Sequence, residues 1–253
     1  MTAGPCRELT VVVPAYNEQK WIGGALRALG EQTDRDFTLV VVDNGCTDDT
    51  AGVVRAFART TPLDVRLVAE PEPGAGTAAD TGFRWAIAHG ATLLARTDAD
   101  CLPARDWVAA VRAQLAAGAE LVCGRSTLRR DEHPSLLERA YPAAVRLAAV
   151  YGRWRPAHRA PAYRTPYVLV HCHNLALTAE LYQRCGGTPR EELGVGSEDV
   201  TLLNRARRHT DRIVRAEQVV VASSLRRLRA WGLRRTLLWH WDRRYRPASV
   251  HVR

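Results

Sequence analysis

The sequence lacks any long uninterrupted run of apolar residues. Its 253 residues are 46% hydrophobic and 25% charged, but no stretch reaches the roughly 20 apolar residues that a membrane-spanning helix needs. Residues 1–7 also lack the basic head and apolar core of a signal peptide. We therefore expect neither an integral membrane protein nor a secreted one, and we predict a cytoplasmic location.

Closely spaced cysteine pairs are absent as well. The six cysteines are scattered along the chain without a Cys-x-x-Cys pair, which excludes a zinc knuckle and a disulfide-rich framework. Acidic residues are outnumbered, 27 against 36 basic ones, and the net charge is +9. Such a surface favours polyanions, phosphates or anionic lipid, although a basic surface without any specific partner explains the charge equally well.

What the sequence does contain, over its first hundred residues, is an alternation of apolar runs and helical patterns. Strands are expected at 9–13, 39–42, 65–68 and 92–96, and helices at 21–29, 50–58 and 81–88. Strands that alternate with helices are typical of βαβ units and a parallel sheet.

The second half has weaker patterns. Helices are expected at 107–117, 135–151 and 198–208, strands at 120–124, 168–177 and 213–222, and a loop at 152–167. Pro142 should interrupt the helix that contains it. No repeat or linker divides the chain, so we predict one α/β domain over residues 9–225, followed by a basic, aromatic C-terminal extension over 226–253.

Polar and mostly acidic residues follow the expected strands, where open parallel sheets bind ligands. They are Tyr16, Asn17 and Glu18, then Asp43, Asn44, Thr47 and Asp48, then Asp98 and Asp100. An acidic edge would repel a phosphate unless a divalent cation stood between them. Two carboxylates two residues apart point the same way and suit Mg²⁺ or Mn²⁺ bound to a diphosphate. The alternative is a pair of turn acids that cap the next helix.

Four segments in order resemble the family 2 glycosyltransferases. They are Val-Val-Val-Pro-Ala-Tyr-Asn-Glu at 11–18, Val-Val-Asp-Asn-Gly-Cys-Thr-Asp-Asp-Thr at 41–50, Thr-Asp-Ala-Asp-Cys-Leu-Pro at 97–103, and Gly-Ser-Glu-Asp-Val-Thr-Leu-Leu at 196–203. The resemblance implies a GT-A fold, a Rossmann-type, mostly parallel sheet flanked by helices. It also implies an inverting enzyme that moves a sugar from a nucleotide diphosphate to an acceptor hydroxyl or amine.

The resemblance further implies roles for individual residues. The nucleotide would lie in residues 9–103, bordered by Pro14, Tyr16 and Glu18, contacted by Asp43 or Asn44, and held with Mg²⁺ or Mn²⁺ by Asp98 and Asp100. Residues 120–210 would shape the site for the acceptor, which could be a small molecule, a lipid or a glycan. There Asp199 would be the general base, and Glu198 and His173 would contact the acceptor. Helix capping is the alternative role for Glu198 and Asp199.

Three positions depart from the pattern of the family. Asn44 replaces the usual second acid of its segment, and Ala78-Ala79-Asp80 replaces Ala-Arg-Asn, which leaves Arg84 as a candidate substitute. Residues 222–224, Ala-Ser-Ser, stand where many relatives carry a metal-binding histidine. His171 and His173, on one face of an expected strand, are candidates to compensate, so the need for a metal stays open.

Other functions explain parts of the sequence. The segment 74–79, Gly-Ala-Gly-Thr-Ala-Ala, matches a loose dinucleotide-binding pattern, but residues 70–73 separate it from the strand and remove the tight turn that such sites need. A non-catalytic nucleotide-sugar binder would fit the missing Arg and His. No helix-turn-helix, zinc finger or RNA-binding aromatic motif is present, so we expect no nucleic-acid partner.

The segment 225–246 combines leucine and tryptophan with many arginines. It could lie on an anionic membrane at the inner face, with the aromatic side chains at the interface. Alternatively, it forms a helix packed on the catalytic core, with arginine stems covering apolar surface.

Overall fold

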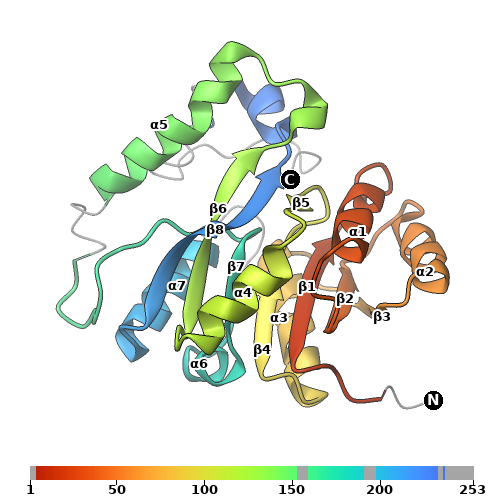
Figure 1. The fold of residues 1–253 in the computed structure, drawn as a ribbon, viewed down its shortest axis with the longest axis horizontal. Coiled ribbons are helices and arrows are strands. Elements are labelled where there is room, and N and C mark those ends of the chain that lie inside the picture. The colour runs from red at the N-terminus through yellow and green to blue at the C-terminus, as the bar shows by residue number, and fades with distance from the viewer. Residues whose placement is uncertain (1–3, 153–158, 191–197, 233–235, 237–253) are drawn as a thin grey trace.

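The apolar runs of the first half form the parallel part of one sheet in the computed structural model, which describes residues 4–152, 159–190, 198–232 and 236. Four strands lie in the order β3-β2-β1-β4 (Figure 1). Their bounds are Leu9–Ala15 for β1, Phe37–Asp43 for β2, Asp64–Ala69 for β3 and Leu93–Arg96 for β4. They pair in parallel, as the alternation with helices predicts.

The second half extends the same sheet in the order β4-β7-β6-β8-β5. The strands are β5 (Leu102–Pro103), β6 (Leu121–Leu128), β7 (Leu175–Thr178) and β8 (Ile213–Ser223). Strand β7 runs antiparallel to both β4 and β6, whereas β6 and β8 are parallel. The two halves therefore share one continuous sheet across the β4–β7 pair.

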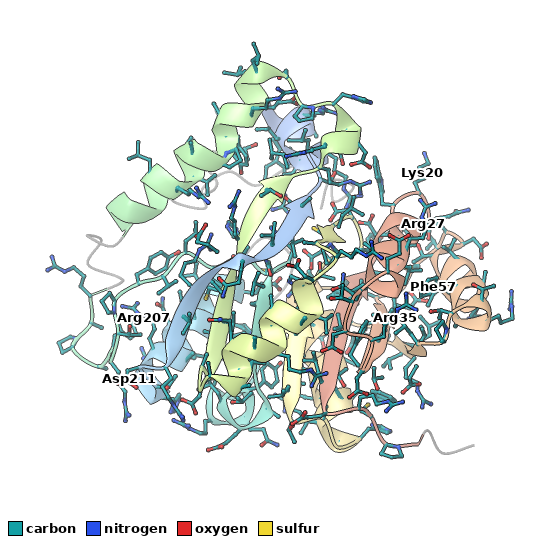
Figure 2. All side chains as sticks on the ribbon, in the orientation of Figure 1. Lys20, Arg27, Arg35, Phe57, Arg207 and Asp211 are labelled. Atoms are coloured by element: carbon teal, nitrogen blue, oxygen red, sulfur yellow. The ribbon has the colours of Figure 1, made fainter. Side chains whose placement is uncertain are left out.

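Helices cover both faces of this sheet (Figure 1). One face carries α1 (Ile22–Gly30), α2 (Thr50–Thr60) and α4 (Trp107–Ala116), and the other carries α3 (Ala75–Ala88), α6 (Ala179–Arg184) and α7 (Glu198–His209). Along β1, Val11 and Val13 belong to the first core and Val12 to the second. Burial on both faces explains why the central strands are apolar without interruption. Exposed basic side chains such as Lys20, Arg27 and Arg35 lie on the outside (Figure 2).

Helix α3 begins at Ala75, six residues before the expected start at residue 81. Its glycines suggest a loop, but here they allow close packing. A Cβ on Gly82 would lie 2.5 Å from Val12 Cγ1 on β1, and one on Gly76 would lie 2.4 Å from Glu198 Oε2. Close tertiary packing therefore outweighs the low helix propensity of glycine.

The strand expected at 168–177 is only four residues long and begins at Leu175. A turn precedes it, in which the backbone N–H of Asn174 donates to the His171 carbonyl. His171 and His173 therefore lie outside any strand, although their rings stack with centroids 5.2 Å apart. The buried side chain of Asn174 joins this turn to α4, β6 and β8. It accepts from Trp107 Nε1 and donates to the carbonyls of Arg125 and Val219, each at 2.9 Å.

Replacing Asn174 with alanine should destabilise the fold strongly. It would leave one buried donor, one buried acceptor and one half-buried acceptor without their partner, at about 1–3 kcal/mol for each unsatisfied buried group. We expect a loss of about 3 kcal/mol or more in the free energy of unfolding, measured by urea denaturation. Asn204→Ala is the control, since Asn204 on α7 accepts one side-chain bond, from Arg207. Equal effects of the two substitutions would contradict this account.

Helix α5 (Leu136–Gly152) continues through Pro142, so the expected interruption is wrong. Proline removes one backbone donor, and the lost bond is tolerated on a helix with a largely exposed surface (Figure 1). Sequence patterns also missed the short η1 (Arg130–Glu132), β5 and α6. Most of the segment 225–246 and part of the loop 152–167 lie outside the described residues. Within the described ranges, no helix is long and apolar enough to cross a bilayer.

Candidate active site

The carboxyl ends of the parallel strands meet at one edge of the sheet. Ala15 at the end of β1 is level with Asp43 at the end of β2, and Asp43 is level with Ala69 at the end of β3. The β1–β4 ladder stops at Val12, and Pro14 lies beyond it, where its missing N–H interrupts no bond to β4. Tyr16, Glu18, Asp98 and Asp100 therefore emerge at the edge where doubly wound sheets bind ligands.

Two asparagines hold the loops of this edge in place. Asn17 adopts φ 54°, and its Oδ1 accepts from the backbone N–H of Thr47 at 2.8 Å, which joins the loops after β1 and β2. Asn44 is buried; its Nδ2 donates to the carbonyls of Glu70 and Glu72, and its Oδ1 accepts from the Gly74 N–H. An amide donates and accepts at once, as a carboxylate cannot. Asn44 therefore fixes the loop between β3 and α3. Asp43 beside it accepts from the Cys46 N–H.

Glu18 and Asp100 converge on one guanidinium. Arg226 Nη1 donates to Glu18 Oε2 at 2.9 Å, Nη2 also donates to Glu18, and Nε donates to Asp100 Oδ2 at 3.0 Å. Burial raises the pKa of Glu18 to about 7, although the Arg226 charge acts to lower it. The structure thus joins the segment after β1 to the Asp-x-Asp segment through a residue from beyond β8.

A second buried guanidinium joins the Asp-x-Asp segment to the Glu-Asp segment. Arg96, at the end of β4, is 3% exposed. Its Nε lies 3.1 Å from Asp98 Oδ1, and its Nη2 lies 2.9 Å from Glu198 Oε1. Burial alone would lower the pKa of Arg96, but the charges of Glu198 and Asp98 raise it well above its usual value. Asp98 and the start of α7, a hundred residues further along the chain, therefore lie on the same side of the molecule.

Asp199 follows Glu198 in the first turn of α7, and its Oδ1 accepts from the Val200 N–H at 2.8 Å. That bond is consistent with the capping role, because it satisfies one N–H group of the first helical turn. Burial raises the pKa of the Cys172 thiol, and Asp199, Glu198 and Asp98 all raise it further. One thiol thus lies within electrostatic reach of the three carboxylates.

His173 lies within electrostatic reach of Asp98 and Asp100. Its Nε2 is 2.9 Å from Ser126 Oγ, and Ser126 Oγ is 3.2 Å from Ser223 Oγ. Burial lowers the pKa of His173, whereas Asp98 and Asp100 raise it. The imidazole is therefore linked to β6 and, through Ser126, to the end of β8.

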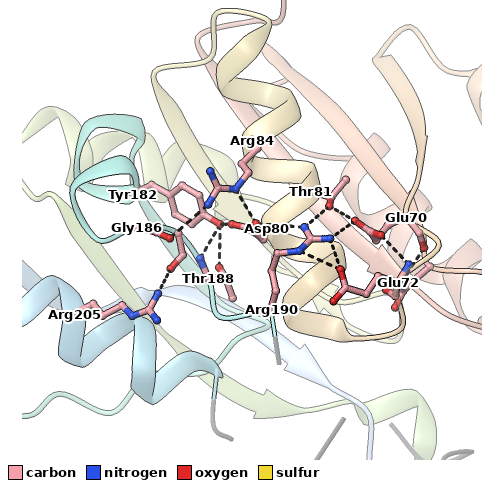
Figure 3. A network of polar contacts seen from close by, with 12 residues as sticks. Glu70, Glu72, Asp80, Thr81, Arg84, Tyr182, Gly186, Thr188, Arg190 and Arg205 are labelled. Carbon is pink, nitrogen blue, oxygen red and sulfur yellow. Dashed lines mark hydrogen bonds and ion pairs between the residues drawn. The ribbon is translucent and has the colours of Figure 1, made fainter. Parts of the chain in front are cut away.

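On α3, where the family pattern has Ala-Arg-Asn and this chain has Ala78-Ala79-Asp80, the structure shows a network of polar contacts around Asp80 (Figure 3). Asp80 is buried and accepts from Tyr182 Oη at 2.6 Å, from Arg84 Nε at 2.7 Å and from Arg190 Nη1 at 3.4 Å. Arg190 also contacts the carboxylates of Glu70 and Glu72. Arg84 is thus engaged in a link between α3 and the end of α6, and Arg190 joins that link to the loop after β3.

The donor set suits a hard divalent cation that shares its ligands with a phosphate. Asp98 and Asp100 offer carboxylate oxygens, the ligands that Mg²⁺ and Mn²⁺ prefer. Within the described part of the chain, no three His, Cys, Asp or Glu side chains are arranged to enclose a metal by themselves. Diphosphate oxygens and water would have to complete the coordination shell.

Sequence reasoning missed the arginines of this site. Arg96, Arg129 and Arg226 each contact Asp98 or Asp100. Only Arg96 left a local signal, because a charged residue at the end of an apolar run must find a buried partner.

Comparisons with known proteins show which family the chain resembles. Residues 10–164 match the family model described as glycosyl transferase family 2. Validoxylamine A glucosyltransferase of Streptomyces hygroscopicus subsp. limoneus is 30% identical over 222 residues, which cover 79% of this chain and 48% of that protein. An uncharacterized glycosyltransferase of Mycobacterium tuberculosis is 31% identical over 188 residues, 73% of this chain and 77% of that protein. The chain thus spans about half the length of the validoxylamine A glucosyltransferases that it matches.

A solved structure extends the likeness to the fold. The mannosyltransferase PcManGT of Pyrobaculum calidifontis, in complex with GDP-Man and Mn²⁺, is 29% identical and has a TM-score of 0.65. The match covers 94% of this chain and 64% of that one. It confirms the α/β fold class that the sequence predicts. The match to the family model covers more than half of the sequence, and this chain therefore belongs to glycosyl transferase family 2.

Proposed function

We propose that this chain transfers a sugar from a nucleotide diphosphate to an acceptor hydroxyl or amine, with inversion at the anomeric carbon. One observation carries the proposal, namely the bridge from Asp98 through Arg96 to Glu198. It brings the segment suited to a diphosphate and the segment that carries Asp199 to the same edge of the sheet. A transferase needs both partners of its reaction at one place.

Asp199 is the proposed general base. Its carboxylate would take the proton from the acceptor O–H as that oxygen attacks the anomeric carbon, while the bond from that carbon to the diphosphate oxygen breaks and its electrons leave with the diphosphate. The base must be ionised and within about 3 Å of the attacking oxygen. Glu198 and His173 are the proposed acceptor contacts. The charges of Asp199 and Asp98 both raise the pKa of the Cys172 thiol, which supports a common site for these two acids.

Donor binding is assigned to the first half of the sheet. Residues 9–103 would hold the nucleotide and 120–210 the acceptor, within a domain over 9–225. Pro14, Tyr16, Glu18, Asp43 and Asn44 are the proposed nucleotide residues, Asn44 through the loop that it fixes. PcManGT, the similar solved protein, carries a nucleotide sugar and Mn²⁺ in its structure, which supports this assignment.

Mg²⁺ or Mn²⁺ is the proposed cofactor, held by Asp98 and Asp100. When bound, such a cation neutralises charge on the departing diphosphate. The two carboxylates leave most of the coordination shell to donor oxygens and water, so cation and donor should bind cooperatively.

A thermal-shift screen of nucleotide sugars, with and without Mn²⁺, tests the proposal. A ligand that binds only the native state raises the melting temperature by mass action. We expect one nucleotide sugar to raise it with Mn²⁺ and much less after EDTA. A screen in which NADH, but no nucleotide sugar, stabilises the protein would contradict the assignment and favour a dinucleotide site.

A nucleotide-sugar binder without turnover remains the second candidate, because the metal-binding histidine is missing after β8 and Arg84 and Arg190 are engaged at α3. Release of nucleoside diphosphate from the stabilising donor decides between the two. Turnover supports the transferase, and binding without turnover supports the second candidate.

Contact between residues 225–246 and an anionic membrane also stays a prediction. The described part of this segment is packed, with Leu225, Leu228 and Trp231 buried. Liposome flotation tests the contact: protein that stays at the bottom with anionic vesicles would contradict it.

A further inference from the structure

Arg226 occupies a central place in the donor site. It begins the helical segment 226–232, just after β8, and its side chain is only 21% exposed. Its guanidinium contacts Asp100, 126 residues earlier in the chain, and Glu18, 208 residues earlier. A side chain from the end of the domain thus neutralises carboxylates from the loops after β1 and β4.

A frame of neighbouring side chains fixes the position of this guanidinium. It lies 5.9 Å from the centroid of the Trp21 ring, and the Arg129 guanidinium lies 5.5 Å from the same centroid. Arg129 Nη1 also donates to the Asp100 backbone carbonyl at 3.0 Å. Asp100 therefore has an arginine on its carboxylate and another on its carbonyl.

The contact at Asp100 conflicts with the role proposed for that carboxylate. Arg226 Nε and Nη2 both lie 3.0 Å from Oδ2. A divalent cation at the same oxygen would stand within a few ångströms of the guanidinium charge, in a site where water screens poorly. A cation that binds Asp100 Oδ2 would therefore compete with Arg226 for this oxygen.

We propose that the Arg226 guanidinium balances the charge of Asp100 while no divalent cation is bound. A divalent cation that binds Asp100 must displace this guanidinium from the carboxylate. The inference rests on the proposed function, because it takes Asp100 as a cation ligand. Displacement would not strand the guanidinium, since two of its nitrogens donate to Glu18. Arg226 would thus stay beside the site while its contact with Asp100 opens.

The sequence after β8 fits this role. Residues 222–224 are Ala-Ser-Ser, which offer no imidazole to a cation, and Arg226 follows two residues later. The segment after β8 therefore supplies the positive charge of Arg226 to Asp100.

The inference is tested by measuring the affinity for Mn²⁺ without nucleotide. Binding is monitored by electron paramagnetic resonance, in which the signal of free Mn²⁺ falls as the ion binds. Arg226→Gln should bind Mn²⁺ about tenfold more tightly than wild type, because the competing charge is gone. Arg226→Lys restores the charge and should bind within about twofold of wild type. Arg229→Gln is the matched control and should match wild type, because Arg229 lies on the same helical segment and pairs with Glu138.

A charge-balanced variant guards against misfolding. Arg226→Gln leaves Glu18 buried without its cation, whereas Glu18→Gln with Arg226→Gln removes both charges and should also bind Mn²⁺ more tightly than wild type. Equal Mn²⁺ affinity in wild type, Arg226→Gln and the double variant would overturn the role of Arg226 and leave the metal site standing. No Mn²⁺ binding by any variant, even with nucleotide present, would overturn the metal site itself and this inference with it.

Discussion

Replacing Asp199 with asparagine should lower turnover by about a thousandfold and leave donor affinity nearly unchanged. A positioned general base contributes about 10²- to 10⁴-fold, and an amide cannot take the proton of the acceptor. Asparagine keeps the Oδ1 that accepts from the Val200 N–H, so the first turn of α7 should persist. Turnover is measured as nucleoside diphosphate released from the donor that most stabilises the protein, and donor affinity by calorimetry.

Asp211→Asn is the control for this substitution. Asp211 is exposed just beyond the C-terminal end of α7 (Figure 2), away from the acids at the start of that helix. The Asp211→Asn substitution removes the same charge as Asp199→Asn and should leave turnover within about twofold of wild type. If Asp199→Asn keeps wild-type turnover, the base lies elsewhere; if it abolishes donor binding as well, Asp199 belongs to the donor site.

Replacing Asp100 with asparagine should weaken Mn²⁺-dependent donor binding by about a hundredfold, a size typical of disturbed metal sites. The substitution removes a negative ligand but keeps an oxygen that can accept from Arg226 Nε, and Arg226 retains Glu18. The fold should therefore survive. The expected signature is a melting temperature that no longer rises when Mn²⁺ is added to the protein with its donor.

Asp106→Asn is the control for Asp100→Asn, because both residues lie in the connection between β4 and α4. Asp106 is exposed just before α4, where its side chain makes no capping bond. This variant should keep the full Mn²⁺-dependent rise. Donor binding that survives Asp100→Asn with the same dependence on Mn²⁺ would remove Asp100 from the cation site.

The sequence predicts the first half of the fold well because its strands are buried on both faces. Runs such as 39–42 are apolar without interruption, and parallel pairing follows from the helices between them. The pattern is weaker where local rules compete with packing. Gly76 and Gly82 suggest a loop but allow α3 to contact Glu198 and β1. A turn from His171 to Asn174 shortens the strand that the alternation predicts, and the side chain of Asn174 bonds to residues 45 to 67 positions away.

The residues of the candidate site also fall into two groups, those that sequence patterns could predict and those that they could not. Residues that follow strands could be found from sequence, because strand ends place them at one edge; Glu18, Asp98 and Asp100 are of this kind. The arginines between them could not, since Arg226 meets Asp100 across 126 residues and sits in an arginine-rich segment that looks like a solvated or lipid-facing surface. Only tertiary structure shows which of many arginines turns inward.

The most direct test of the central claim is the position of Mn²⁺ in a crystal grown with the stabilising nucleotide. We predict an anomalous difference peak within about 2.2 Å of an Asp100 carboxylate oxygen. The diphosphate should lie against the peak, and the nucleoside should lie beside Tyr16 and Asp43. A nucleotide bound at another edge of the sheet, or a peak remote from both Asp98 and Asp100, would contradict the account.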